Sequence, residues 1–438
     1  MKHSMKTSFS RQVVLLLVAV FLLTVVGRLV TVTGAAFYCE GFPICTPTAP
    51  VGYLKLLHLT LVAFASVVMY LVWRKAWREQ RHHNSVLPVT TVTGILFLGQ
   101  ALIGAVIVTR GYPMHLVVLH AFTAVSLWIS LAMLVFISGT LKEDGVADYP
   151  YDWKRRAKDF FILSKPVIVL LLLVTTYGGL VAGGKAWPSA SLTFWTLLGG
   201  ALAAGGSSAL NQYIDRELDK NMQRTSKRPL ADGRLTAAEG LSYGLALSLI
   251  SYYVMAGFVN LLAALLSLAG IFYYVFFYSV WLKKATVQNI VIGGGAGAIP
   301  PMVGWAAATG SLNLAAWILF AIIFLWTPPH FWALAIVRIK DYARAGVPML
   351  PVVQGEEKTR EQIFIYTVVL VAVTLLLPIL NLAGTVYLIS ALVLGAFLLY
   401  AAWRVFREGG NKVAWTMYRW SSMYLAFIFL ALMLDAVM

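Results

Sequence analysis

The amino-acid sequence predicts an all-α polytopic membrane protein, and hydropathy, span length and charge placement each support that class. Of the 438 residues, 60% are hydrophobic and 12% are charged, and the mean hydropathy is +0.79. About thirteen apolar runs recur along the chain, each of about 20 residues, which is the length that crosses the hydrocarbon core of a bilayer. The expected helices are residues 12–32, 53–73, 89–109, 114–137, 166–184, 192–212, 236–258, 260–281, 287–308, 313–337, 363–380, 384–404 and 414–436.

A polar interval divides these spans into a four-helix module and a nine-helix domain. Residues 139–162 carry closely spaced charges, and this composition predicts a cytoplasmic linker. The expected modules are therefore residues 1–138 and 163–438. The run at 12–32 is too long for the apolar part of a signal peptide and lacks a small-residue cleavage site, so we expect a retained helix.

The distribution of charge predicts the orientation in the membrane. The net charge is +16, and with a cytoplasmic N-terminus all but five of the 34 Lys and Arg residues fall on the inner side. The five exceptions are Arg28, Lys55, Arg110, Lys185 and Arg419. This pattern indicates a multi-pass protein of the cell (plasma) membrane with the loops at 213–235 and 338–362 in the cytoplasm. It excludes nucleic acid as the partner of the basic residues, because the lipid bilayer accounts for their placement.

An acidic motif follows the span at 192–212. Asn211, Asp215 and Asp219 are four residues apart, so on a helix they share one face. Charged groups at this depth usually face a cavity or a partner. Three cations follow closely: Arg224, Lys227 and Arg228. Because carboxylates bind Mg²⁺ and Arg or Lys bind phosphate oxygens, the motif predicts a magnesium-diphosphate site. The alternative is a charged loop without a ligand.

A second acidic loop is expected on the same face of the membrane. Asp341 lies between Lys340 and Arg344, after the span at 313–337. Two acidic clusters on one face can clamp metal ions on one diphosphate. The predicted metal ligands are thus Asp215, Asp219 and Asp341, and Lys283 and Lys284 are further candidates to bind the diphosphate. Taken alone, the second loop also fits an amphipathic segment lying at the interface.

Residues 160–438 resemble the intramembrane UbiA-type prenyltransferases, and in particular their protoheme IX farnesyltransferase (heme O synthase) branch. The matching stretches are Ala209–Asp219, Arg224–Leu230, Thr286–Gly294, Ile299–Trp305, Trp326–Ala335 and Asp341–Pro351. The resemblance implies nine helices around a central cavity with Mg²⁺-diphosphate at its mouth. It also implies transfer of a farnesyl group from farnesyl diphosphate to a vinyl group of heme b. Two alternatives stay open: prenylation of an aromatic quinone precursor, and a heme-carrying membrane protein without transferase activity.

One histidine, His330, lies within a predicted span of the transferase domain. It is either a hydrogen-bonded structural residue or a contact for the porphyrin, bound through the iron or a propionate. Trp326, Phe331 and Trp332 would supply flat apolar walls for a macrocycle, and they fit lipid-facing packing equally well.

The N-terminal module carries a separate histidine pair. His58 and His120 are each about five or six residues into spans that begin outside, which is the arrangement that a bis-histidine heme in a helical bundle needs. Two structural histidines are the alternative. Residues 12–137 resemble one half of heme A synthase through Gly27–Gly34, Cys39–Cys45, His58, Leu98–Gln100, Gly104 and His120.

Lys55 stands where the cysteine-bearing half of that family usually has a glutamate implicated in oxidation. We therefore expect this half to bind or hand off heme rather than to oxidise it. The resemblance makes heme A synthase and the assembly factors of cytochrome oxidase candidate partners. Cys39 and Cys45 lie in the loop predicted outside, where a disulfide is plausible and two free thiols are the alternative.

Overall fold

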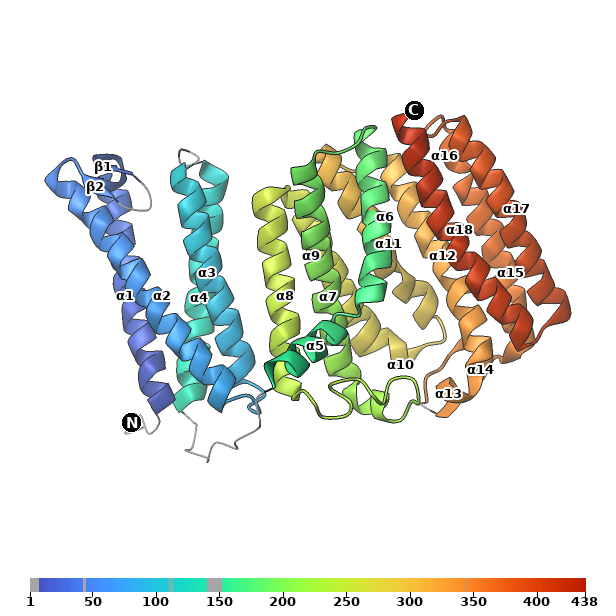
Figure 1. Ribbon diagram of the computed structural model, residues 1–438, viewed down its shortest axis with the longest axis horizontal. Helices are drawn as coiled ribbons and strands as arrows, with labels where there is room; N and C mark the ends of the chain where they lie inside the picture. The colour runs from blue at the N-terminus through green and yellow to red at the C-terminus, as the bar shows by residue number, and fades with distance from the viewer. Residues whose placement is uncertain (1–7, 42–44, 110, 112, 140–151, 345) are drawn as a thin grey trace. The chain divides into compact units, whose positions relative to one another are not determined.

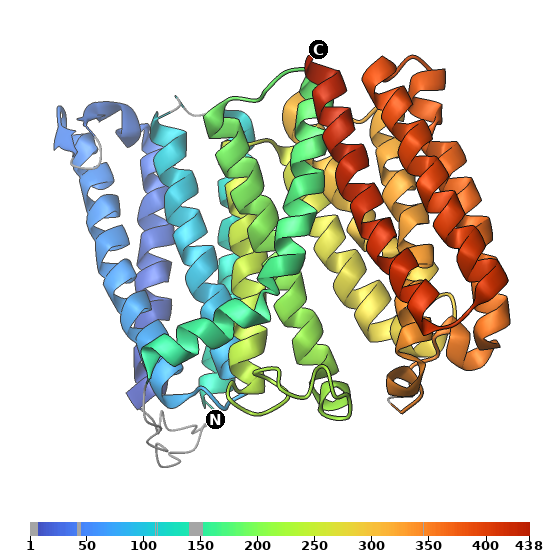
Figure 2. The same cartoon turned by 45° about the vertical axis from the view of Figure 1, so that its right-hand side comes forward.

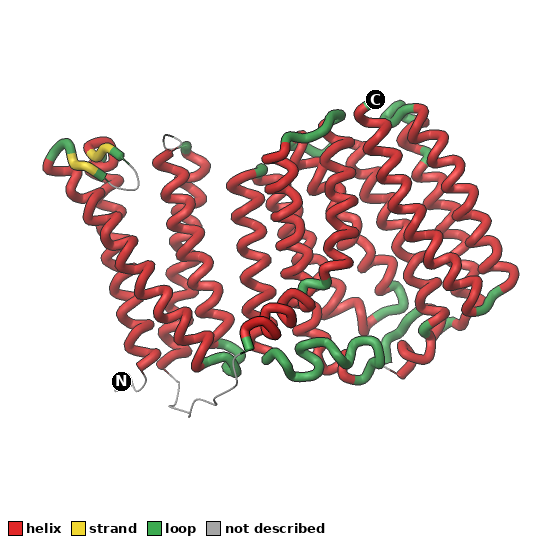
Figure 3. Tube along the Cα trace, viewed as in Figure 1, coloured by secondary structure: helices red, strands yellow, loops and turns green. Residues whose placement is uncertain are grey.

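A computed structural model describes residues 8–438 apart from 42–44, 110, 112, 140–151 and 345. These residues are almost entirely helical, as Figure 3 shows, so the predicted all-α fold is confirmed. They form two compact units: unit 1 contains Met1–Asp152 and Thr236–Ala246, and unit 2 contains Trp153–Leu235 and Leu247–Met438. Each unit is considered by itself.

Twelve helices of the described chain are long and apolar enough to cross a membrane, one fewer than expected. The expected span at 192–212 does form a helix, α7 (Ala190–Lys220), which is 31 residues long. It is missing from the twelve because glycine, serine and threonine lower the hydropathy of its first part and the acidic motif occupies its last part. A helix that carries a polar site gives a weaker hydropathy signal than one that only faces lipid.

Unit 1 is built on a four-helix bundle in which α1 packs on α2 and α4, and α3 packs on the same two helices (Figure 1). The helices are α1 (Ser8–Thr33), α2 (Tyr53–Glu79), α3 (Val86–Thr109) and α4 (Met114–Gly139). Between α1 and α2 lie η1 (Ala35–Tyr38), the short antiparallel strands β1 (Cys39–Glu40) and β2 (Thr46–Pro47), and η2 (Pro50–Gly52). A disulfide joins Cys39 to Cys45 across this hairpin.

The predicted linker at 139–162 divides into two parts. Residues 140–151 lie outside the described residues, whereas α5 (Trp153–Leu163) is a regular helix. The second half of the predicted linker is therefore helical. In α5, Asp159 and Leu163 are four residues apart and buried on one face, whereas Lys154, Arg155 and Lys158 are exposed, which is the pattern of an amphipathic helix.

Unit 2 contains nine long helical segments in the part of the chain that the structure describes after Lys165, and one of them, α8, is shared with unit 1 (Figures 1 and 2). They are α6 (Pro166–Gly184), α7, α8 (Ala237–Phe258), α9 (Leu261–Phe272) continued by η3 (Tyr273–Leu282) and α10 (Lys283–Ala285), α11 (Asn289–Thr309), α12 (Leu314–Val337), α15 (Gly355–Thr374) with α16 (Leu376–Ile379), α17 (Thr385–Glu408) and α18 (Asn411–Val437). The short helices α13 (Ile339–Arg344) and α14 (Leu350–Val353) form the loop after α12.

Glycine allows the closest helix crossing in unit 2, between α6 and α11. A Cβ added to Gly304 would lie 1.8 Å from the carbonyl oxygen of Thr176, and one added to Gly179 would lie 2.0 Å from that of Pro301. Membrane helices lack a strong hydrophobic drive to associate, so they use such small residues to bring backbones into van der Waals contact.

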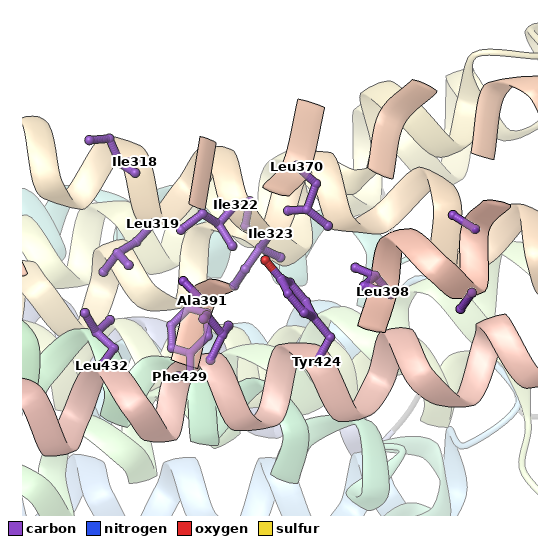
Figure 4. Close-up of a cluster of buried hydrophobic side chains, with 14 of the residues drawn as sticks. Ile318, Leu319, Ile322, Ile323, Leu370, Ala391, Leu398, Tyr424, Phe429 and Leu432 are labelled. Atoms are coloured by element: carbon purple, nitrogen blue, oxygen red, sulfur yellow. The ribbon is translucent and has the colours of Figure 1, made fainter. Parts of the chain in front are cut away.

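The largest apolar core of unit 2 lies among α12, α15, α17 and α18 (Figure 4). Leu319 and Ile323 of α12 and Leu398 of α17 are almost completely buried there. The opposite faces of these helices expose large apolar side chains, such as Phe397. Apolar side chains on both faces are expected of helices that pack on one side and meet lipid on the other.

Candidate active site

The acidic motif lies on one face at the end of α7, as its spacing predicted. Asn211, Asp215 and Asp219 are 4%, 1% and 2% exposed. The side-chain amide of Asn211 donates a hydrogen bond of 2.8 Å to Oδ2 of Asp215, four residues further along the helix. Two carboxylates in so small a buried region are stable only if cations accompany them.

Three cations from three different segments accompany the motif. Lys283 of α10 donates to Oδ2 of Asp215 at 2.5 Å, and Arg228 of the loop after α7 donates to Oδ2 of Asp219 at 2.7 Å. Lys165, which precedes α6, donates to Oδ1 of Asn211 at 3.0 Å. Lys165 was not predicted as a site residue, because 46 positions separate it from its partner in the sequence.

The environment of Lys165 is unusual in two respects. Its backbone is in the left-handed region, with φ of 49°, which non-glycine residues rarely adopt. Burial and the neighbouring charges of Arg228 and Lys283 lower the pKa of its ammonium group to about 7, and Asp215 and Asp219 oppose this shift only partly. The ammonium group of Lys165 therefore lies where an additional anion would stabilise its charged form.

A π-helix positions the side chains that face α7. The segment η3 runs for ten residues and delivers Ser279 and Lys283, four positions apart, to Asn211 and Asp215, which are also four apart. The hydroxyl of Ser279 donates to the carbonyl oxygen of Tyr274 at 2.9 Å and accepts from Asn211 at 3.0 Å. Widened turns of this kind are frequent at functional sites.

One atom of the cluster has no partner. Oδ1 of Asp215 is buried and accepts no hydrogen bond from any described residue, although Oδ2 accepts two. A buried carboxylate oxygen without a partner is costly, so an additional ligand is expected there. Carboxylate and amide oxygens are the donors that Mg²⁺ prefers, and Asn211, Asp215 and Asp219 therefore fit such an ion.

The structure does not bring Asp341 into this cluster. Within the described residues, no three acidic, histidine or cysteine side chains gather closely enough to hold a metal ion. Asp341 on α13 instead lies 4.0 Å from Arg338 on the same turn. Its neighbour Tyr342 is mostly buried, and burial raises the pKa of the Tyr342 hydroxyl while Arg224 and Arg338 oppose the rise. Arg224 thus lies within electrostatic range of the second loop.

The other predicted cations make no described contact with the acidic motif. Lys227 is exposed, and its backbone carbonyl accepts from Arg234 at 2.8 Å. The side chain of Lys284 lies outside the described residues.

Asn289, at the start of α11, is buried, and its amide donates to the carbonyl oxygen of Pro348 at 3.4 Å. It connects α11 to the loop that carries Asp341, a link that no local pattern could have indicated.

His330 is enclosed by other side chains. Its Nδ1 shares a hydrogen bond of 2.8 Å with the hydroxyl of Ser421, and its ring stacks on Trp326 at 4.2 Å and on Tyr418 at 4.4 Å. Trp326 in turn donates from Nε1 to the carbonyl oxygen of Ser421 at 2.7 Å. With two aromatic rings stacked on the imidazole and one of its nitrogens hydrogen-bonded, this geometry favours the structural interpretation of His330 over a porphyrin contact.

The histidines of unit 1 are in the opposite situation. Nδ1 of His58 and Nδ1 of His120 are buried without a partner among the described residues, and so is Oε1 of Gln100. A Cβ on Gly27 would lie 2.8 Å from the His58 ring, and one on Gly104 would lie 3.3 Å from the His120 ring. The two imidazoles are within electrostatic range of each other.

Lys55 does not belong to this group. Its ammonium group donates to the carbonyl oxygens of Ala36 and Cys39, each at 3.3 Å. It therefore fastens the disulfide-bonded hairpin to α2, which gives this buried lysine a structural role.

Comparison with known proteins agrees with the geometry of unit 2. The sequence profile of the UbiA prenyltransferase family matches residues 172–428. Fold and site thus define an intramembrane prenyltransferase. A protein from Roseiflexus sp. (strain RS-1) named protoheme IX farnesyltransferase is 39% identical over 438 residues, covering 95% of this chain and 82% of the relative. The chain therefore belongs to the UbiA prenyltransferase family, among its protoheme IX farnesyltransferases.

Solved structures support the fold. A structure described in work on digeranylgeranylglyceryl phosphate synthase superposes with a TM-score of 0.56 at 17% identity, covering 65% of this chain and 99% of that one. A UbiA homolog from Archaeoglobus fulgidus bound to DMAPP and Mg²⁺ superposes with a TM-score of 0.51 at 17% identity, covering 63% and 99%.

Proposed function

We propose that unit 2 transfers the farnesyl group of farnesyl diphosphate to a vinyl group of heme b, which makes the chain a heme O synthase. The bond between C1 of farnesyl and the diphosphate oxygen breaks, and a carbon–carbon bond forms between C1 and the vinyl terminus. Water adds to the other vinyl carbon, and diphosphate and a proton leave. The observation that carries the proposal is the buried cluster of Asp215, Asp219, Lys283 and Arg228.

The chain's own residues supply the binding of the diphosphate. Asn211, Asp215 and Asp219 would hold Mg²⁺, which when bound neutralises the charge that develops on the leaving diphosphate. Arg228 and Lys283 are then free to donate to phosphate oxygens rather than to carboxylates. Nζ of Lys165 would keep its proton beside the diphosphate, because the added negative charge raises its lowered pKa.

Aromatic rings lie beside the place where the allylic cation would form. Tyr274 and Tyr278 of η3 stack with ring centroids 5.5 Å apart, on the π-helix that carries Ser279 and directly precedes Lys283. The face of an aromatic ring attracts a cation at short range. These tyrosines therefore complement a positively charged C1, whereas the carboxylates of α7 serve the diphosphate end of the substrate.

The charge pattern supports a site that opens to the cytoplasm of the cell. The loops around Asp219 and Asp341 are rich in Lys and Arg, and such loops usually stay on the cytoplasmic side. Cysteines introduced at Ser226 and at the exposed Lys358 should react with an impermeant reagent only from the inside. Labelling from the outside of intact cells would reverse this orientation.

The test is an assay of the purified chain with heme b, farnesyl diphosphate and Mg²⁺, read by mass spectrometry of the porphyrin. Formation of heme O that stops on chelation of Mg²⁺ supports the proposal. A parallel reaction with an aromatic carboxylic acid precursor of quinones separates the two acceptor classes. Heme that stays bound without turnover would favour the carrier alternative, and product formed only from the aromatic acid would favour the quinone alternative.

We propose a second function for unit 1, the binding of one heme between His58 and His120. The supporting observation is that both imidazoles bury an unpartnered Nδ1 and that Gly27 and Gly104 let the two rings pack directly against α1 and α3. Both residues fit axial ligation, and a heme so held would be low-spin. With Lys55 fastened to the outer hairpin, no acidic group replaces the family's glutamate, so binding or hand-off without oxidation is expected.

The test uses the full chain and its visible absorption spectrum. His58→Ala and His120→Ala should each remove a sharp low-spin heme signal, while the surface variant His82→Ala should keep it. A spectrum unchanged in both alanine variants would return the two histidines to structural roles. Heme A synthase and the oxidase assembly factors remain predicted partners, to be sought only if this heme is present.

A further inference from the structure

A cavity of about 340 Å³ opens at the end of unit 2 that is opposite the acidic motifs. Its walls come from α11, the end of α6, the start of α12, α16 with the loop after it, and the end of α18. The ends of α6 and α18 and the helix α16 lie near the C-terminus in Figure 1. The helices α10, α13 and α14, which neighbour the diphosphate site, lie at the other end of the unit in the same view. The diphosphate site therefore does not extend into this cavity.

One wall of the cavity carries a buried donor without an acceptor. Trp305 is 7% exposed, and its Nε1–H has no hydrogen-bond partner among the described residues. Buried indole N–H groups usually find a partner, because an unpaired donor loses its hydration without compensation. An acceptor held in the cavity would provide that partner.

An exposed lysine, Lys185, lines the cavity. Lys185 follows α6, is exposed and forms no ion pair within the described part of the chain. Its φ is 48°, and Asn381, also in the lining, has φ of 56°. Only one other described non-glycine residue has a positive φ, and that is Lys165 at the diphosphate site. Such backbone conformations gather at ligand sites, where the surrounding structure maintains them.

The one carboxylate in the lining is already engaged. Asp435 accepts from the backbone N–H of Gly384 at 2.5 Å and from that of Tyr387 at 3.1 Å, so it caps the start of α17. A Cβ on Gly384 would lie 2.9 Å from Oδ1, so glycine is needed for this approach. Most of the other wall residues are apolar, including Leu319 and Leu432. The cavity thus offers two free donors beside apolar surface.

We propose that this cavity binds the oxyanion group of a membrane amphiphile, with Trp305 Nε1 and Lys185 Nζ as donors and the leucine walls against hydrocarbon. The oxyanion is either the phosphate of an anionic phospholipid or a carboxylate of the porphyrin acceptor. The second source rests on the proposed function, and the first does not.

The test compares Trp305→Phe, which removes only the N–H donor and little volume, and Lys185→Gln with the unchanged full chain. The matched controls are Trp317→Phe, an exposed tryptophan of α12, and Lys412→Gln, an exposed lysine in the first turn of α18. Retention of phosphatidylglycerol is measured by native mass spectrometry, and KM is measured for protoheme and for its dimethyl ester. Equal melting temperatures establish that the variants are folded.

A fall of about fivefold or more in phosphatidylglycerol retention, the loss expected for one hydrogen bond, with KM for protoheme unchanged, identifies a phospholipid. A similar rise in KM for protoheme but not for the dimethyl ester identifies the porphyrin carboxylate. If both measurements match the controls, the cavity is not an oxyanion site. Absence of all turnover in the unchanged chain would reject the acceptor reaction and leave the phospholipid measurement valid.

Discussion

In unit 2, each polar side chain of the α7 motif has a cationic partner: Lys165 for Asn211, Lys283 for Asp215 and Arg228 for Asp219. In unit 1, the imidazoles of His58 and His120 are buried with Nδ1 unpartnered. A charged cluster must be neutralised to exist in the apo protein, and its cations can later turn to the substrate. Neutral imidazoles tolerate burial better than charged groups, so Nδ1 of each ring can lack a partner until a ligand arrives.

This contrast predicts which unit loses function when one side chain changes. Asp215→Asn should lower the rate of heme O formation by about a hundredfold or more, because it removes the charge that would hold Mg²⁺ at the leaving group. Turnover is measured by mass spectrometry of the porphyrin. The control is Glu217→Gln on the same helix, whose exposed carboxylate pairs only with Lys220 and Arg216. Near-normal turnover of the Asp215 variant would remove the metal assignment.

A second prediction concerns the stability of unit 2 rather than its catalytic activity. Gly304→Val should destabilise the protein by about 1–3 kcal/mol, the usual cost of overpacking, because the added carbon would meet the Thr176 carbonyl oxygen. Gly297→Val on the same helix has no atom within 4 Å of the new Cβ and serves as the control. Thermal unfolding in detergent distinguishes the two. Equal melting temperatures would mean that the α6–α11 crossing is looser than described.

A variant of Lys165 tests whether the cations of the site bind the substrate as well as the α7 motif. Lys165→Met keeps most of the side-chain volume and removes the charge, so KM for farnesyl diphosphate should rise about tenfold, the effect of one charge-assisted hydrogen bond. KM for heme b should stay unchanged. An unchanged KM for farnesyl diphosphate would confine Lys165 to its bond with Asn211.

The smallest effect on transfer is expected in unit 1. His58→Ala should remove bound heme from the four-helix unit and leave kcat of prenyl transfer within about twofold, because the UbiA family match lies entirely at residues 172–428. Heme content is read from the absorption spectrum and kcat from the porphyrin product. A large fall in kcat would show that the histidine pair takes part in delivering the acceptor, and the two units would then no longer be functionally separate.

Local patterns predicted the parts of this protein that depend on neighbours along the chain. Spans of about 20 apolar residues predict helices because the backbone must satisfy its own hydrogen bonds in lipid. The four-residue spacing of Asn211, Asp215 and Asp219 places them on one face of α7 because a helix repeats every 3.6 residues. α7 also shows the limit of hydropathy, since the polar residues that form the site lower its score.

Contacts between distant segments could be decided only by the tertiary structure. Ser279 and Lys283 each meet residues 68 positions earlier, and His330 meets Ser421, 91 positions later. No spacing rule relates such pairs, because packing of whole helices brings them together. Among the described residues, the same packing gathers no three acidic, histidine or cysteine side chains at one point, and it stacks His330 on two aromatic rings. The residue types thus predicted the chemistry, and helix packing selected which of them share a site.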